Sequence, residues 1–575
     1  MTRPRLLNSI MRKWAIMRAD NRLTVIVMAA VVGLCSGLAA VALGRALHFA
    51  AATLADVHHY WWGVALPAVG ASLSAIFLNF LLREQAGHGV PEVVYAVSKQ
   101  GGRLRFRTSF SRLISSFLTI GSGGSAGPEA PVVISGAALG SNIARWLRLK
   151  ERQRVILVGC GAAGAIAAIF NAPLTGLVFT VEVILGEWRA FNIIPIAISA
   201  VAGTELSRLL RGDELVFQHQ QFRLHPVDIA ASFGVVVLAT IVSVLLGRLL
   251  NGMARFAHGT PLPRWLRPAV GGGAVGLIGI YWPVVLGEGY GYIQQMIQGA
   301  FDQGLGLAAL LMVGKVLATS LTIGWGGSGG IFAPCLMIGS LLGVFYFRLL
   351  TWVVPAAALA GEGCFALLGI AGLISGLLQA PLTAIFLVVE ITGGHDVILP
   401  LIVVSTLTST FCFYIEPGSY YLRELIEKGQ YLRPGTDARV LSDLTVAELV
   451  ESGYRCVPAD MLLRDFVSIL EHSRSYLFPV HEPGTSRYKG MIFVDRIRPY
   501  LFDRQMHSVL FVDQLMETEV PTVTAGDELA DVLNLMEREN LSALPVVENE
   551  RFVGMLSKAV LLDHYRKELI VQTSA

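Results

Sequence analysis

Long apolar runs without a single charged residue restrict this chain to a membrane-spanning fold. Residues 60–82 form one such run, and residues 229–247 and 397–415 form two more. A helix needs about 20 apolar residues to cross roughly 30 Å of hydrocarbon, which is close to the length of each run. The composition agrees, because 54% of the 575 residues are hydrophobic and only 15% are charged. We therefore predict an all-α polytopic membrane domain.

The start of the chain predicts its orientation. The first apolar run begins at Leu23 and continues past residue 40, which is longer than the apolar core of a signal peptide, so we interpret it as a retained span. Residues 1–22 carry six basic residues and one acid, Asp20. Loops rich in lysine and arginine stay in the cytoplasm. We expect a cytoplasmic N-terminus in a protein of the plasma or inner membrane.

The membrane part contains an internal repeat. Residues 112–140 match residues 315–343 at an offset of 203, with 13 of 29 positions identical, and Arg112 corresponds to Lys315. Membrane domains built from two similar halves are typical of secondary transporters, whose sites lie near the membrane midplane where interrupted helices meet. The repeat therefore predicts such a site.

A second block extends the repeat. Residues 161–182 match residues 369–390 at an offset of 208, with 10 of 22 identical, and Glu182 corresponds to Glu390. We expect these two glutamates to have a structural role, such as satisfying backbone donors.

Each half carries a glycine-rich stretch followed by a helix start. Residues 121–127 hold four glycines, which makes them a poor helix, whereas Pro128 suits a first helical position. Residues 324–330 repeat this pattern before "IFAP" (331–334). Non-helical backbone inside a membrane is tolerated only around a cavity or within packed protein. The spacing of Gly136 and Gly140, and that of Gly339 and Gly343, also predicts helix-packing seams.

Two such helix starts predict an anion site. A helix start leaves unpaired N–H groups and about half a positive charge. Two that converge can hold an anion without a cationic side chain, weakly enough for release. Glu129 lies at one of these starts, so its carboxylate can act as a tethered competitor that is displaced by protonation or by the anion. The alternative is that Glu129 only caps its helix.

Four segments resemble motifs of the CLC family of chloride channels and chloride/proton antiporters. They are "GHGVPE" (87–92), "GPEAP" (127–131), "GGIFAP" (329–334) and "PGSYYL" (417–422). The resemblance covers roughly residues 20–425. It implies two halves of opposite orientation, several helices too short to span, and a homodimer with one pathway per subunit. The implied substrate is chloride or a similar small anion, accompanied by protons in the antiporters.

The resemblance also implies roles for individual residues. Glu129 would be the gate, and the N–H groups of Ile331 and Phe332 would hold chloride together with the Tyr421 hydroxyl. Tyr420 takes this last role if the alignment shifts by one residue. The implied anion-binding residues are His88, Gly127, Ala130, Gly330, Ile331, Phe332 and Tyr421. No metal or other cofactor is implied.

Three positions depart from the family pattern. His88 replaces a central serine and can donate a hydrogen bond or attract an anion, although it could also be a loop residue without pore contact. Pro128 replaces an arginine before the gate. Val183 replaces the internal glutamate that relays protons in antiporters, and valine cannot carry a proton. We predict channel-like or weakly proton-coupled chloride transport, with chloride/proton antiport as the alternative.

The last part of the chain has the composition of a soluble domain, because its charged fraction more than doubles from about residue 437. Two stretches in it resemble CBS modules, each with an apolar strand that contains a proline–valine pair (477–480 and 544–547) and a second strand after a turn. The predicted domains are a basic N-terminal segment (1–22), a transport domain (23–425), a linker (426–440) and two CBS modules (441–502 and 513–568).

The CBS pair lacks the acids expected of a nucleotide site. Nucleotide-binding modules of this kind follow the second strand with Ser/Thr-x-x-Asp, in which the aspartate holds ribose. Val560 and Arg496 stand at the two aspartate positions. We expect a dimer-stabilising or gating-coupled scaffold, with adenine-nucleotide binding as the alternative.

Other classes of function have little support. A net charge of +3 gives no reason to expect a nucleic-acid partner, and six scattered cysteines without CxxC predict neither zinc nor a disulfide framework. An intramembrane protease is the remote alternative. The HExxH of a metalloprotease is absent, the His58–His59 pair has the wrong spacing, and Ser328 in "GGSG" (326–329) has no accompanying histidine. We therefore do not expect an enzyme.

Overall fold

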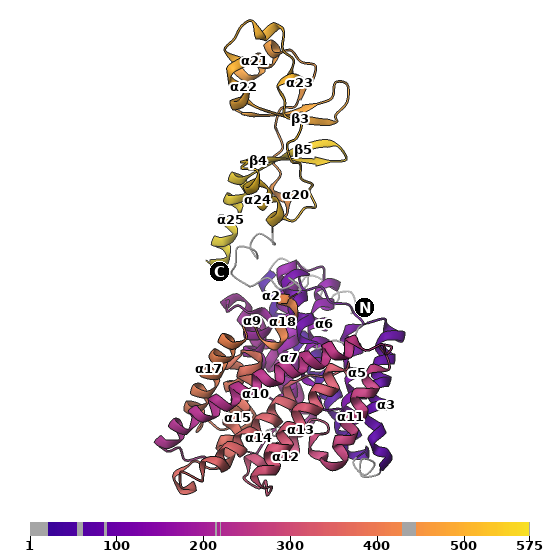
Figure 1. Cartoon of the computed structure of the whole chain (residues 1–575), viewed down its shortest axis with the longest axis vertical. Helices are drawn as coiled ribbons and strands as arrows, with labels where there is room; N and C mark the ends of the chain where they lie inside the picture. The colour runs from indigo at the N-terminus through magenta and orange to yellow at the C-terminus, as the bar shows by residue number, and fades with distance from the viewer. Residues whose placement is uncertain are drawn as a thin grey trace, which may run out of the picture. The chain divides into compact units, whose positions relative to one another are not determined.

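The chain forms two compact units, Met1–Tyr431 and Leu432–Ala575. The computed structural model describes residues 21–54, 61–84, 89–212, 216–218, 220–427 and 444–573, so most of the predicted linker lies outside the described residues. Figure 1 shows the first unit as a bundle of helices and the second as a mixture of short strands and helices.

The described secondary-structure elements of the first unit are all helices, joined by non-helical segments. Its first half comprises α2 (Asn21–Leu54), η2 (Trp61–Val64), α3 (Ala65–Ile76), η3 (Phe77–Leu82), α4 (Val90–Lys99), α5 (Thr108–Gly121), α6 (Glu129–Trp146), α7 (Glu151–Phe170), α8 (Pro173–Phe179), η4 (Thr180–Leu185) and α9 (Ala190–Arg211). Its second half comprises α10 (Pro226–Gly259), α11 (Arg267–Tyr281), η5 (Pro283–Val285), α12 (Tyr290–Ile297), α13 (Leu305–Gly324), α14 (Phe332–Leu350), η6 (Ala356–Ala358), α15 (Glu362–Leu378), α16 (Pro381–Thr392), α17 (Ile398–Ile415) and α18 (Tyr420–Glu427).

Within the described residues, eight helical segments are long and apolar enough to cross a membrane. Other apolar helices, such as α15 and α16, are shorter. This mixture confirms the predicted polytopic all-α membrane domain.

The sequence repeat is also a repeat of structure. Helix α6 begins at Glu129 and α14 at Phe332, which differ by the same offset of 203 as the sequences. Pro128 and Ile331 precede them as the capping residues. Pro128 was predicted to be the first helical residue, and α6 in fact begins one residue later, at Glu129. Asn171 and Gln379, at the offset of 208, both end a helix in the left-handed conformation.

Reciprocal hydrogen bonds join the two halves. The N–H of Ser125 donates to Thr322 Oγ1 at 3.1 Å, and the N–H of Ser328 donates to Thr119 Oγ1 at 3.2 Å. The two donors, Ser125 and Ser328, are repeat equivalents, and so are the two acceptors, Thr119 and Thr322. The two glycine-rich stretches therefore exchange the same contact, as two halves related by an approximate two-fold axis would.

Glu182 and Glu390 make a second reciprocal pair of contacts. Glu182 accepts hydrogen bonds from the Thr383 N–H and hydroxyl, at 2.8 and 2.7 Å. Glu390 accepts the equivalent bonds from Thr175, both at 2.6 Å. Each carboxylate thus satisfies backbone donors at the start of a helix in the other half, α16 or α8, where a negative charge is favourable. This is the structural role expected from the sequence.

The predicted packing seams bring helix backbones close together. A Cβ added to Gly140 would lie 2.0 Å from the Leu157 carbonyl oxygen, and one added to Gly343 would lie 1.9 Å from that of Phe365. The α6–α7 pair and its repeat equivalent, α14–α15, therefore pack at distances that only glycine permits.

The second unit contains two small modules of similar topology. In the first, β2 (Leu477–His481) pairs antiparallel with β3 (Tyr488–Phe493) and parallel with the short β1 (Val457–Pro458). In the second, β4 (Ala543–Glu548) pairs antiparallel with β5 (Arg551–Ser557), and Val523 bridges to β4 in parallel. The helices of the unit are α20 (Val446–Leu449), α21 (Leu463–Glu471), α22 (Val494–Leu501), η7 (Met506–Ser508), α23 (Val512–Leu515), α24 (Leu529–Arg538) and α25 (Lys558–Thr573).

Replacing Gly343 with alanine should destabilise the protein, because the new Cβ would force the α14 and α15 backbones apart. Overpacking of this kind costs about 1–3 kcal/mol. We expect Gly343→Ala to unfold at a lower temperature than the wild type in detergent. Gly252→Ala in α10 is the matched control, since a Cβ there meets nothing within 4 Å. Equal melting temperatures for the two variants would contradict the close approach.

Candidate anion site at two helix starts

The starts of α6 and α14 touch through their backbones. Gly127 and Gly330 exchange two hydrogen bonds, with N···O distances of 2.8 and 2.6 Å, and both residues are buried. A Cβ added to Gly330 would lie 3.0 Å from the Ala130 Cβ and 3.1 Å from its nitrogen. The sequence therefore places glycine where the two helix starts approach most closely, and the two positive helix ends meet inside the membrane domain.

Glu129 lies at this meeting point. It is the first residue of α6 and is only 1% exposed. Its Oε1 accepts a hydrogen bond of 2.8 Å from the Tyr290 hydroxyl, and the backbone N–H of Ala333, near the start of α14, also faces the carboxylate. Oε2 is buried and has no hydrogen-bond partner among the described residues. A carboxylate from one half thus occupies the start of a helix from the other half.

The predicted donors Ile331 and Phe332 form the start of α14. Ile331 is the capping residue and Phe332 the first helical residue, and both are buried. The Phe332 ring packs against Phe170 at 5.4 Å and against Phe179 at 6.2 Å between ring centroids. These apolar side chains keep the helix start in a dry environment, where the peptide N–H groups act on an anion more strongly than in water.

A third helix start, that of α4, lies beside the start of α6. Gly89 caps α4 with a φ of +79°, and a Cβ on it would lie 2.8 Å from the Ala130 carbonyl oxygen. Glycine is therefore required there both by the backbone conformation and by the space. His88, the residue before it, lies outside the described residues.

The two tyrosines of α18 are both buried but have different surroundings. Tyr421 lies near Cys335 and the Glu129 carboxylate, whereas Tyr420 lies near Cys335 and Glu424. Tyr421 is therefore the tyrosine whose surroundings include the Glu129 carboxylate.

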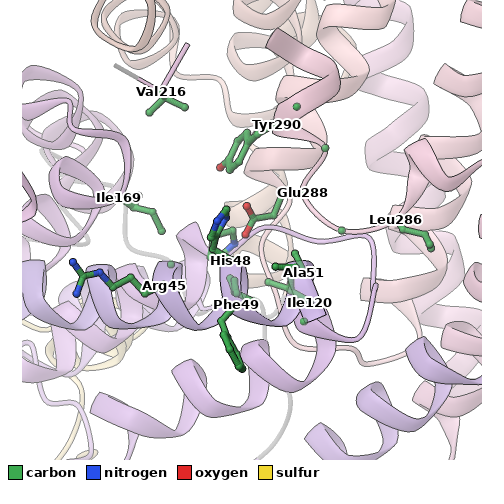
Figure 2. Close-up of a pocket in the computed structure, with 18 of the residues that line it drawn as sticks. Arg45, His48, Phe49, Ala51, Ile120, Ile169, Val216, Leu286, Glu288 and Tyr290 are labelled. Carbon is green, nitrogen blue, oxygen red and sulfur yellow. The ribbon is translucent and has the colours of Figure 1, made fainter. Parts of the chain in front are cut away.

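A cavity of about 1100 Å³ reaches the site from one side. Its lining includes Pro128, Glu288 and Tyr290, together with two basic side chains of α2, Arg45 and His48. Figure 2 shows His48, Glu288 and Tyr290 pointing toward the same space. Because the Tyr290 hydroxyl also bonds to Glu129, this tyrosine connects the cavity with the buried carboxylate.

Two buried cations at equivalent repeat positions fix the surrounding backbone. The Lys315 Nζ is fully buried and donates to the carbonyl oxygens of Val285 and Gly287, at 3.0 and 2.7 Å. Arg112, its repeat partner, instead forms an ion pair of 2.6 Å with Glu92 of α4. Lys315 thus fixes the segment before α12, and Arg112 fixes the start of α4. Among the described residues, neither cation bonds to Glu129.

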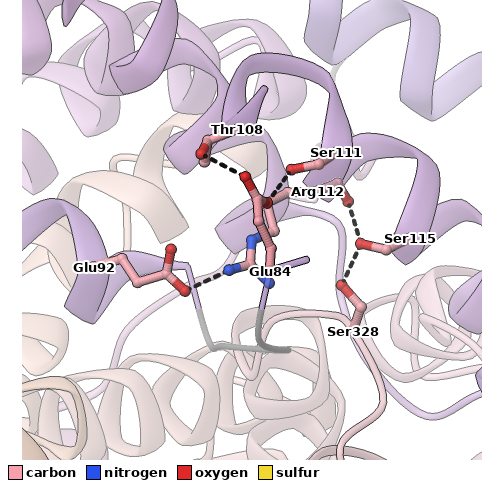
Figure 3. A network of polar contacts seen from close by, with 7 residues as sticks. All are labelled: Glu84, Glu92, Thr108, Ser111, Arg112, Ser115 and Ser328. Carbon is pink, nitrogen blue, oxygen red and sulfur yellow. Dashed lines mark hydrogen bonds and ion pairs between the residues drawn. The ribbon is translucent and has the colours of Figure 1, made fainter. Parts of the chain in front are cut away.

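Figure 3 shows the polar network on the Arg112 side. Glu84 accepts hydrogen bonds from Ser111 at 2.8 Å and from Thr108 at 3.4 Å. Ser115 bonds to the Arg112 carbonyl at 3.2 Å and shares a hydrogen bond of 2.8 Å with Ser328.

Ser328 therefore has structural contacts. Its hydroxyl bonds to Ser115, and its N–H bonds to the Thr119 hydroxyl. Neither partner is a base, so nothing in these contacts favours the protease alternative.

Sequence reasoning missed Glu288, Tyr290 and Lys315 as parts of the site. Lys315 was recognised only as the repeat partner of Arg112. The one sequence signal for the other two was the glycine-interrupted "GEGYG" (287–291), which marks a break before α12 but does not predict what it touches.

In the CBS region, internal contacts occupy the positions expected to bind ribose. The Ser557 hydroxyl bonds to Glu451 at 3.1 Å and accepts a hydrogen bond of 3.3 Å from the Val560 N–H. Arg496 stacks on the Phe493 ring at 4.9 Å and forms an ion pair with Glu517. Neither position presents a carboxylate toward a ligand.

The fold and the paired helix starts define a polytopic membrane protein with a duplicated architecture and a candidate site where its two halves meet. A family model described as voltage gated chloride channel matches residues 70–412, and a CBS domain model matches residues 512–567. The chain therefore belongs to the CLC family of voltage-gated chloride channels and their relatives, and it carries a CBS domain.

Similar proteins and structures agree with this assignment. The H(+)/Cl(-) exchange transporter ClcA of Vibrio cholerae is 31% identical over 402 residues, which cover 66% of this chain and 85% of the relative. ClcA of Vibrio vulnificus is 30% identical over 426 residues, 71% and 90% of the two chains.

Two solved structures share the fold. A slow cyanobacterial Cl-/H+ antiporter has a TM-score of 0.64 at 23% identity and covers 72% of this chain and 98% of its own. A eukaryotic CLC transporter has a TM-score of 0.64 at 18% identity and covers 95% of this chain and 98% of its own.

We expect the CBS region to bind no adenine nucleotide, because neither module offers a carboxylate to ribose. Isothermal titration of the purified full-length protein with ATP, ADP and AMP should give no binding heat, and none of the three should raise the melting temperature. Saturable binding of any of them would contradict the scaffold assignment.

Proposed function

We propose that this protein transports chloride across the membrane along a pathway between the starts of α6 and α14, with Glu129 as the gate. The observation that carries the proposal is that the Glu129 carboxylate lies buried at the Gly127–Gly330 contact, with Oε2 unpartnered. The carboxyl group of Glu129 thus lies where two helix starts meet. A chloride ion of the same charge is suited to the same place once the carboxylate leaves.

Peptide N–H groups suit such a pathway better than cationic side chains. They attract an anion through partial charges that are fixed by the helices, and they do not form a strong ion pair that would slow release. We assign the anion contacts to Ala130, to the N–H groups of Ile331 and Phe332, and to the Tyr421 hydroxyl, with His88 as a further contact. Gly127 and Gly330, whose N–H groups bond to each other's carbonyl oxygens, line the anion site through the rest of their backbone.

Tyr290 has a specific part in this gate. Its hydroxyl donates a hydrogen bond of 2.8 Å to Glu129 Oε1. A hydrogen bond to a charged group is stronger than one between neutral groups. We assign to Tyr290 the role of holding the ionised carboxylate in the pathway. Protonation of Glu129 removes the negative charge and weakens the hydrogen bond from Tyr290. The gate should therefore open as pH falls.

We propose that proton coupling is weak, because Val183 is a buried residue of η4 that cannot carry a proton. Stoichiometric chloride/proton exchange is the second candidate, and it is favoured by the relatives that are named H(+)/Cl(-) exchange transporters. The two candidates share the same pathway and differ in one observable, which is whether protons move in fixed ratio against chloride.

We also propose the arrangement in the cell. The basic residues 1–22 support a cytoplasmic N-terminus in the plasma or inner membrane, with the CBS modules on the same side. A homodimer with one pathway in each subunit is supported by the family resemblance.

In purified protein reconstituted into liposomes, wild-type chloride efflux should rise as the external pH falls, because protonation releases the gate. Glu129→Gln should change the flux strongly and remove this pH dependence, because glutamine cannot ionise. The measurement is chloride efflux with simultaneous pH recording. Unchanged flux and an unchanged pH response would exclude Glu129 from the mechanism.

The same recording separates the two candidates for coupling. Under a chloride gradient, weak coupling predicts little or no proton movement in the wild type, whereas exchange predicts proton movement in fixed proportion to chloride.

Tyr290→Phe should raise chloride flux at neutral pH by roughly tenfold, because a hydrogen bond to a charged group contributes about 1.5–3 kcal/mol. At acidic pH, where Glu129 is protonated, the variant and the wild type should converge. Tyr292→Phe, on the same helix and lining the same cavity, is the matched control and should behave as the wild type. Equal flux in both variants across the pH range would rule out Tyr290 as the anchor.

A further inference from the structure

Five arginines line a separate cavity of about 530 Å³ between two loops of the first half. One loop connects α4 to α5 and the other connects α6 to α7. The arginines are Arg103, Arg105, Arg145, Arg148 and Arg154. No part of the pathway described above requires them.

The positive charge of this arginine cavity is largely uncompensated. Arg154 is buried, with 9% of its side chain exposed, and pairs at 3.7 Å with Glu151, which is 61% exposed. Among the described residues, Arg103, Arg105 and Arg148 form no ion pair. Arg103 and Arg145 lie close enough to Arg154 to repel its charge. A protein that holds like charges together in this way is suited to an anionic ligand that offsets the repulsion.

The loops around the cavity are fixed in place. Ser141 of α6 accepts a hydrogen bond from the Leu104 N–H at 2.9 Å and donates to the Gly102 carbonyl at 2.6 Å. The Arg154 Nε donates to the Gly101 carbonyl at 2.6 Å. The arginines therefore extend from an ordered frame, which reduces the ordering cost of binding a ligand.

The surroundings indicate a position at the cytoplasmic membrane interface. The two loops are rich in arginine and lysine, as cytoplasmic loops are. Phe106 and Trp146, next to the arginines in sequence, are 65% and 83% exposed. Exposed aromatic side chains beside apolar helices are typical of the headgroup level of a bilayer.

We propose that the arginine cavity binds the phosphate headgroup of an anionic phospholipid of the cytoplasmic leaflet. Guanidinium groups bind phosphate oxygens in pairs of parallel hydrogen bonds, and basic pockets between membrane helices on this side are suited to anionic headgroups. A free phosphate ion shares the headgroup chemistry. A free phosphate would not contact Phe106 and Trp146, whereas the glycerol and upper acyl chain of a lipid would lie against these exposed aromatic side chains.

Native mass spectrometry of the delipidated full-length protein tests this proposal, with phosphatidylglycerol and phosphatidylcholine as probes. The wild type should bind phosphatidylglycerol in preference. Arg103→Gln/Arg148→Gln should weaken that binding about 30-fold, the combined effect of two arginines at a membrane surface. Both side chains are exposed, so the variant should fold, and its melting temperature checks this. Arg255→Gln/Arg264→Gln removes the same charge from exposed positions outside the cavity and should bind as the wild type.

Three results would overturn the proposal. Equal binding of the two lipids would show no headgroup selection. Equal weakening in both double variants would show a general surface-charge effect. Displacement of phosphatidylglycerol by millimolar inorganic phosphate would assign the cavity to a soluble anion instead.

Discussion

The contact between Gly127 and Gly330 is the constraint on which the rest of the structure depends. Two short hydrogen bonds join the segments that lead into α6 and α14, and they place two positive helix ends side by side inside the membrane domain. Such ends would repel each other without an anion between or beside them. Glu129 supplies that anion from within the chain, and its burial follows from the contact.

The duplicated architecture explains how this contact is held. The bonds from Ser125 and Ser328, and those made by Glu182 and Glu390, each occur twice, once from each half. The two halves differ at the gate, since the repeat equivalent of Glu129 is Phe332. One helix start therefore carries a carboxylate, whereas the other carries an apolar ring that packs against Phe170 and Phe179. In the proposed function, this asymmetry makes the first half the gate and the second half the fixed part of the site.

Local backbone chemistry accounts for what the sequence could predict. Glycine-rich stretches and the repeat offset located the helix starts at Glu129 and Phe332 to within a residue, because helix ends depend on neighbouring residues. Tyr290 could not be found in this way, since its contact with Glu129 joins residues 161 apart in sequence. The arginine cavity could not be predicted for the same reason, because it forms only when the α4–α5 loop packs against α6 and α7. Lys315 was recognised by its repeat partner, yet the carbonyl groups that it binds become visible only in the fold.

The central claim is that backbone N–H groups at the paired helix starts hold a halide. Anomalous diffraction from crystals grown in bromide tests it most directly, with the wild type and Glu129→Gln measured side by side. The account predicts a bromide peak within hydrogen-bond distance of the Ile331 and Phe332 N–H groups. It also predicts, in the variant, greater occupancy where the carboxylate had been. Bromide peaks only at arginine side chains, with none at the helix starts in either protein, would contradict it.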